Sequence, residues 1–322
     1  MEFRTTVTPH PFPEGTVSHG SPILLIGSCF SDNIGELMRD RLFEVTVNPF
    51  GPLYNPLSIL AALERLERRE LLEASYLFSY GGMCHSFDFH SRYSRSTSDD
   101  ALAAMNGSIA RAADALRSAS TVIITLGTVR VFRLCSQGHR PVANCHKLPA
   151  SEFSEERLTL EQTSAALEAI AATVGRVNPD ARIVFTISPL RYLGGGAHDN
   201  LIIKSTLALA LEQTLTRHPG MLYFPAYEIM MDDLRDYRFY AEDMRHPSAV
   251  AVDYIFGKFM EASCSPATIA LAADSRRLTR RLAHREMSGN DEANDTLRRQ
   301  LAADFASRHP STRTALSRLI QF

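Results

Sequence analysis

Short apolar runs alternate with longer amphipathic stretches along most of the chain, and this alternation constrains the fold more than any other feature. Buried strands are predicted at residues 23–26, 44–47, 121–126, 182–187 and 221–224. Helical spacing of apolar residues is found at residues 57–72, 101–116, 158–174, 201–217 and 249–260. Strands separated by helices require crossover connections, so the sequence predicts an α/β fold with a mostly parallel sheet and helices on both faces.

Three regions depart from this alternation. Apolar and polar residues alternate over 129–134, directly after a strand and before a turn at 136–138, which predicts a β-hairpin excursion. Residues 75–98 lack a clear period and predict irregular structure with a further hairpin. The last part of the chain is rich in Arg and lacks Lys, with a helix over 271–286, a break at 288–295 and a weaker helix after it. We expect one domain over residues 1–267 and a helical extension over 268–322, which packs on the domain or on a second copy of the chain.

Composition excludes several classes of function. The 322 residues include 34 basic and 36 acidic side chains, and this near-neutrality argues against a nucleic-acid binder that works through a general basic field. No apolar run approaches the ~18 residues of a membrane span, and no signal peptide is visible. The five cysteines are scattered without a Cys-x-x-Cys pair, so we expect a reducing, cytoplasmic location and no disulfide framework.

Two short segments carry residues suited to nucleophilic chemistry. Ser28 follows the first predicted strand where a helix begins, at the sheet edge where ligands bind in open parallel sheets. The alternative interpretation of Ser28 is a cap of that helix. Asp243 precedes His246 by three residues, so the carboxylate can hold Nδ1–H while Nε2 accepts a proton from a serine. Together Ser28, Asp243 and His246 predict a nucleophilic triad.

Several motifs resemble one bacterial family. The sequence GSCF at 27–30 resembles the signature of the GSCFA domain, a branch of the SGNH (GDSL-like) hydrolase superfamily. Further segments similar to that domain are NPFGPLYNP at 48–56, NCHK at 144–147, SPLR at 188–191, and DYRFY at 236–240 leading into DMRHP at 243–247. The resemblance covers roughly residues 20–260. It implies a flavodoxin-like three-layer α/β/α sandwich with Ser28 as nucleophile, Asp243 as acid and His246 as base.

The resemblance also implies an oxyanion hole, and here the chain departs from the superfamily. The superfamily uses the nucleophile's own N–H, a glycine N–H after the second strand and an asparagine after the third. Ser28 and Gly51 match the first two. Gly127, Thr128 and Val129 stand where a Gly-x-Asn motif is expected, so the third donor is Thr128 or Asn144, the latter carried back by the hairpin.

Other candidates have structural alternatives. His146 or His85 is a candidate for lining a substrate pocket, with a purely structural role as the alternative. Zinc binding by the pairs Cys84-His85 and Cys145-His146 is disfavoured because adjacent ligands are geometrically awkward. Arg191, before a glycine-rich loop at 194–196, is a candidate for binding a charged or sugar substrate. Cys29 is expected to be buried as a small apolar residue.

These observations predict an SGNH-type serine esterase without metal or organic cofactor. Its substrate is expected to be a small molecule or a glycan ester, from which it removes a small acyl group such as acetyl. Two alternatives remain open: an acyltransferase that uses the same triad on a glycan hydroxyl, and a non-catalytic glycan-binding module with the same fold. No nucleic acid or membrane partner is expected, and the C-terminal helices are the candidate surface for a homo-oligomer.

Overall fold

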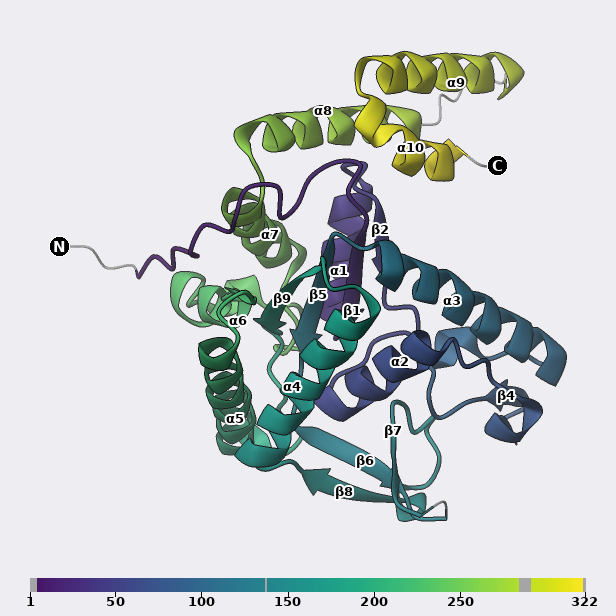
Figure 1. The fold of residues 1–322 in the computed structure, drawn as a ribbon, viewed down its shortest axis with the longest axis vertical. Helices are drawn as coiled ribbons and strands as arrows, with labels where there is room; N and C mark the ends of the chain where they lie inside the picture. Colours follow the sequence, from purple (N-terminus) through teal and green to yellow (C-terminus); the bar gives the residue numbers. More distant parts are fainter. Residues whose placement is uncertain (1–4, 137, 284–290, 321–322) are drawn as a thin grey trace.

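The central sheet is parallel and its strands follow the order β2-β1-β5-β9-β10 in a computed structural model that describes residues 5–136, 138–283 and 291–320 (Figure 1). The strands are β1 (Ile23–Gly27), β2 (Val45–Val47), β5 (Thr121–Leu126), β9 (Arg182–Ile187) and β10 (Leu222–Phe224). All neighbouring pairs are parallel. This is the flavodoxin-like strand order, so the predicted fold class is confirmed.

The apolar side chains of each strand alternate between two cores. One core contains Leu24, Val122 and Phe185, and the other contains Ile23, Ile123 and Val184. The first core packs against α2 (Pro56–Arg68), α3 (Ser98–Ser118), α4 (Leu160–Val177) and α5 (Gly196–Arg217). The second packs against α1 (Cys29–Arg39), α6 (Ala226–Glu228) and α7 (Ala249–Ser263). Because strand side chains point alternately to the two faces, continuous apolar runs produce a sheet covered by helices on both sides.

The predicted hairpin excursion lies at the carboxyl edge of the sheet. It is an antiparallel sheet of order β7-β6-β8, formed by β6 (Arg130–Leu134), β7 (Arg140–Val142) and β8 (Phe153–Arg157). The strand β8 was not predicted, because its sequence FSEER has no apolar alternation. Residue 137 of the predicted turn lies outside the described residues. A second hairpin, β3 (Phe78–Tyr80) with β4 (Met83–His85), confirms the hairpin expected within 75–98.

The C-terminal helices cover the opposite, amino edge of the sheet (Figure 1). They are α8 (Pro266–Ala283), α9 (Asp291–Arg308) and α10 (Arg313–Ile320), and they form their own apolar cluster around Leu42. Thr279 Oγ1 donates to Asp40 O at 2.7 Å, which fixes α8 to the segment after α1. The boundary predicted at 267/268 falls in the first turn of α8. The predicted break at 288–295 is wrong over 291–295, because α9 already begins at Asp291 with a polar first turn; residues 288–290 lie outside the described residues. None of the described helices is long and apolar enough to cross a lipid bilayer.

Candidate active site

A tight strand-to-helix turn positions Ser28. Gly27 has φ 144°, and a Cβ at this position would collide with Thr125 O, so the turn requires glycine. Ser28 is the N-cap of α1: its Oγ accepts from Phe30 N at 3.3 Å, and its own N–H donates to Thr125 O at 3.1 Å. The helix-cap interpretation is therefore confirmed. Ser28 is 0% exposed in this arrangement.

Asn48 fixes this turn from the neighbouring strand end. Its Oδ1 accepts from Gly27 N at 2.9 Å, and its Nδ2 donates to Ser28 O at 3.2 Å and to Asp32 Oδ1 at 3.0 Å. Asn48 has φ 42°, a left-handed conformation that asparagine tolerates better than most residues. Sequence reasoning missed this role, although an Asn directly before Pro49 at a strand end was the available signal.

Gly51 lies in the turn that Asn48 begins. It has φ 85°, and a Cβ would collide with the side chain of His90. Its N–H donates to Asn48 O at 2.8 Å. The two peptide N–H groups expected in the oxyanion hole, those of Ser28 and Gly51, are thus both bonded to carbonyl oxygens in this structure.

The Asp243–His246 pair is formed within one short loop. His246 Nδ1 lies 2.5 Å from Asp243 Oδ2, and Asp243 Oδ1 accepts from the peptide N–H groups of Arg245 and His246 at 2.9 Å each. These hydrogen bonds hold the pKa of Asp243 below its usual range. The loop is closed by a bridge between Tyr240 and Pro247. The predicted orientation of the imidazole by Asp243 is therefore present, and the His246 side chain is 50% exposed.

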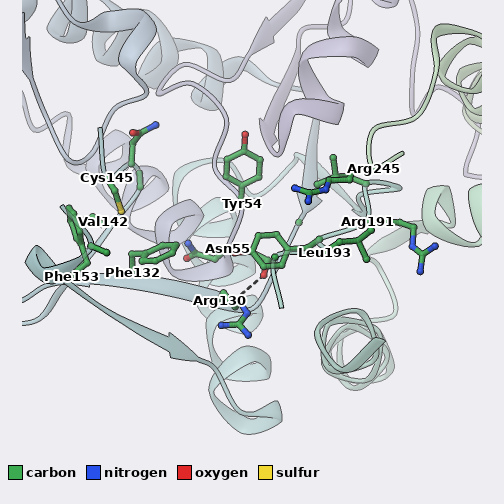
Figure 2. Close-up of a pocket in the computed structure, with 18 of the residues that line it drawn as sticks. Tyr54, Asn55, Arg130, Phe132, Val142, Cys145, Phe153, Arg191, Leu193 and Arg245 are labelled. Atoms are coloured by element: carbon green, nitrogen blue, oxygen red, sulfur yellow. Dashed lines mark hydrogen bonds between the residues drawn. The ribbon is translucent and has the colours of Figure 1, made fainter. Parts of the chain in front are cut away.

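A cavity of about 660 Å³ lies at this edge of the sheet, and Figure 2 shows residues that line it. Of the predicted site residues it collects Thr128, Asn144, Arg191 and His246 in its wall. Ser28, Gly51, Asp243 and His146 are not in that wall. Within the described part of the chain, Ser28 Oγ makes no hydrogen bond to His246.

The two candidates for the third oxyanion donor both line the cavity, in different hydrogen-bonding states. Thr128 N donates to Tyr54 O at 2.9 Å, and Thr128 Oγ1 accepts from Arg130 N at 3.0 Å. Asn144 Oδ1 accepts from His146 N at 2.8 Å, a side-chain bond that stabilises its own turn. Among the described residues no acceptor is bonded to Asn144 Nδ2, so this amide nitrogen is available to a ligand.

His85 and His146 come together in a buried aromatic cluster behind the cavity. Their ring centroids are 4.6 Å apart, and His146 Nε2 donates to Ser86 O at 2.7 Å. Burial lowers the pKa of His146 to about 4, so it is neutral. The two Cys-His pairs are thus neighbours in space, yet the described residues contain no group of three His, Cys, Asp or Glu side chains placed to hold a metal ion.

Two further predicted residues lie close to the site. The peptide N–H of Arg191 donates to Arg245 O at 3.1 Å, which ties the segment after β9 to the His246 loop. The glycine-rich stretch beside it was expected to be a surface loop throughout, but α5 already begins at Gly196 with Gly195 as its cap. Cys29 is partly buried, and burial raises the pKa of its thiol, which disfavours the thiolate.

Sequence reasoning also missed Lys204. Its Nζ donates to Gly127 O and to Ser188 O, at 2.9 Å each, and the side chain is fully buried. These carbonyls follow β5 and β9, so Lys204 joins the two strand ends beside the cavity. Burial lowers the pKa of Lys204 to about 7. The available signal was a lysine within the apolar sequence of the helix at 201–217.

Comparisons with known proteins give one family match. Residues 22–259 match the GSCFA family. Among solved structures, the chain is similar to an acetyl xylan esterase from the rumen bacterium Butyrivibrio proteoclasticus, with 8% sequence identity and a TM-score of 0.38. The alignment covers 76% of this chain and 63% of the esterase, so the chain spans less than two thirds of that protein. The search of curated proteins gave no match.

Proposed function

The chain belongs to the GSCFA family, and we propose that it hydrolyses carboxylic esters with Ser28 as nucleophile, His246 as base and Asp243 as orienting acid. The observation that carries this proposal is the 2.5 Å contact between Asp243 and the His246 imidazole, which lines a cavity. Ser28 caps α1 at the same edge of the sheet. A serine at a helix N-terminus is also near the positive end of the helix dipole, which stabilises a developing negative charge.

The proposed reaction has two steps. Ser28 Oγ bonds to the acyl carbon while its proton passes to His246 Nε2, and the ester C–O bond then breaks as His246 gives that proton to the leaving alcohol. Water attacks the acyl-serine ester in the second step, again with His246 as base, and releases the acid and free Ser28. Asp243 remains ionised throughout and stabilises the imidazolium.

Because Ser28 is buried, the proposal requires that its hydroxyl group becomes exposed to the substrate. Ser28 Oγ bonds to Phe30 N, and His246 is half exposed. The proposal therefore requires Ser28 Oγ and His246 Nε2 to lie within hydrogen-bond reach when substrate is bound, as catalytic hydrogen bonds often form fully only with a ligand in place.

For the oxyanion we propose Ser28 and Gly51 N–H groups, completed by Thr128 or Asn144. Asn144 Nδ2 and the Thr128 hydroxyl can both donate without breaking a hydrogen bond to another described residue, whereas the two peptide N–H groups have to leave Thr125 O and Asn48 O. One donor in such a site contributes about two to three orders of magnitude in rate.

The superfamily resemblance suggests a small acyl group such as acetyl, carried by a carbohydrate. Transfer to a glycan hydroxyl would use the same residues, with the acceptor in place of water in the second step. Incubation with an acetyl donor, with and without a glycan acceptor, separates these outcomes: free acetate indicates hydrolysis, and acceptor-dependent product indicates transfer.

The test of the triad is hydrolysis of p-nitrophenyl acetate by the full chain and its variants. Ser28→Ala and His246→Gln should each lower kcat by at least about a thousandfold. Ser248→Ala is the control, because Ser248 is also a helix N-cap: its Oγ accepts from Ala251 N at 3.3 Å in α7, as Ser28 Oγ accepts from Phe30 N in α1. A folded Ser28→Ala variant with full activity, or an equal loss in Ser248→Ala, would contradict the proposal.

A further inference from the structure

The cavity has a polar end and an apolar end. Figure 2 shows Arg191 and Arg245 on one side, Tyr54 and Asn55 in the middle, and Phe132 with its neighbours on the other side. His246 also lines the cavity, next in sequence to Arg245. The apolar end is formed by Phe132, Val142, Leu148, Ala150 and Phe153.

The apolar end comes from the antiparallel sheet inserted after β5. Phe132 lies on β6 opposite Val142 of β7, and Phe153 begins β8. Val142 is buried in a separate apolar cluster, and Phe153 packs against that cluster. The inserted sheet therefore has its own small core, and Val131 of β6 also anchors it in the first core of the central sheet.

Among the described residues, none of those that line the apolar end carries a charge. Arg130, the charged residue nearest to Phe132 in the cavity lining, donates to Asp199 at 2.8 and 3.1 Å and to Glu155 at 2.7 Å, so its charge is compensated. A ligand group that enters here loses its hydration without gaining a charged partner. This favours hydrocarbon over a sugar, whose hydroxyl groups would be left without hydrogen bonds.

We propose that the apolar end binds the acyl chain of the ester, and that the preferred acyl group is an aliphatic chain much longer than the acetyl group that the superfamily resemblance suggests. This inference rests on the proposed function, because it places the ester carbonyl at His246 and the acyl chain along the inserted sheet. A cavity of about 660 Å³ is of the size that encloses a drug-sized ligand, and an acetyl group would leave most of it unfilled.

The first experiment measures kcat/KM of the full chain for p-nitrophenyl acetate, butyrate and octanoate. Each buried methylene contributes about fourfold in binding, so burial of about two methylenes already gives the expected preference of at least about tenfold for octanoate over acetate. Equal or lower kcat/KM for octanoate would overturn the proposal.

Two variants test whether the apolar end of the cavity causes the preference for octanoate. Ala150→Trp fills the apolar end without removing a side chain that supports the small core, and it should lower the octanoate-to-acetate ratio at least about tenfold. Tyr80→Ser is the matched control, since Tyr80 is an exposed aromatic on the other hairpin and is 42% exposed; it should leave the ratio within about twofold. An unchanged ratio in Ala150→Trp would refute the location.

Two esters that carry the eight-carbon chain either in the acyl group or in the alcohol test which part of the ester enters the apolar end. Ethyl octanoate should be hydrolysed faster than octyl acetate. The opposite order would assign the apolar end to the alcohol and overturn the proposal.

Binding to the Ser28→Ala variant separates this inference from the proposed function. Calorimetric titration should give a Kd for octanoate at least about tenfold below that for acetate, whether or not Ser28 is the nucleophile. If Ser28→Ala still hydrolyses esters, the proposed triad fails while the chain-length preference stands. If Ser28→Ala is inactive and binds the two acids equally, the acyl-chain assignment alone fails.

Discussion

Replacing Lys204 by Met tests the electrostatics of the sheet edge that carries the site. A neutral amine has two hydrogens, and the two carbonyl oxygens at 2.9 Å, Gly127 O and Ser188 O, accept both. The ring of Tyr227, whose centroid is 5.2 Å from Nζ, favours the charged form through a cation–π contact. Burial outweighs this contact, because the charged form loses its hydration, and it lowers the pKa of Lys204 from 10.5 to about 7.

The sign of the resulting pH dependence follows from proton binding. Between pH 7 and 10.5 the unfolded chain holds a proton on Lys204 that the folded chain has released, so the free energy of unfolding rises with pH across this window. Below it both states are protonated, and the cost of the buried charge is present in full. A shift of this size corresponds to at most about 5 kcal/mol between the two ends of the window.

The assay is urea unfolding of wild type, Lys204→Met and Lys204→Arg at several pH values from about 6 to about 10. Subtracting the free energy of unfolding of Lys204→Met from that of wild type removes the contribution of the other titrating groups. This difference should increase with pH by several kcal/mol. Lys204→Arg stays charged, so its difference from Lys204→Met should not change. Parallel pH profiles for wild type and Lys204→Met would refute the reasoning, because Lys204 would then titrate alike in both states.

Further predictions concern the turn, the oxyanion and the extension. Asn48→Ala removes two buried hydrogen bonds and a partly buried one, so the free energy of unfolding should fall by about 2–4 kcal/mol in urea titrations. Asn144→Ala should lower kcat far more than it raises KM. If kcat falls in Thr128→Val instead, the donor role belongs to Thr128. Unchanged kcat in both variants would contradict a third oxyanion donor. Asp243→Asn should lower kcat by about 10⁴, and equally at about pH 5 and about pH 8, because the pKa of Asp243 is held below its usual range; a loss that shrinks at the lower pH would contradict this. Truncation after residue 267 should leave ester hydrolysis measurable in a protein that still unfolds cooperatively in urea, since α8 to α10 lie at the opposite sheet edge; a folded but inactive truncation would show that they complete the site.

The sheet could be predicted because its strands are apolar on both faces. The strand at 182–187 has the predicted bounds, since it is a continuous apolar run between turns. Elements held by polar contacts gave no such signal. The strand β8 pairs with β6 through Arg130–Glu155 and Arg133–Glu156 contacts, which depend on the partner strand. The first turn of α5 is polar, and Asn200 bonds back to Tyr192 N at 2.8 Å, so apolar spacing placed the helix start too late.

The same distinction applies to the site. Asp243 and His246 are three residues apart, so their contact follows from local geometry and was predictable. Asn48 contacts Gly27 across 21 positions, and Lys204 contacts Gly127 across 77, so only the fold brings these pairs together. The buried state of Ser28 has the same origin, because it depends on how the turn is packed and not on the residues beside it.

Labelling with a fluorophosphonate and peptide mapping by mass spectrometry tests the central claim most directly. An activated serine forms a stable phosphonyl ester at its Oγ with loss of fluoride, whereas an unactivated one does not react. The account predicts one adduct, on Ser28, in the wild-type chain, and its loss in a folded His246→Gln variant. An adduct on another residue, or none in a chain that hydrolyses p-nitrophenyl acetate, would contradict the assignment of Ser28 as the nucleophile.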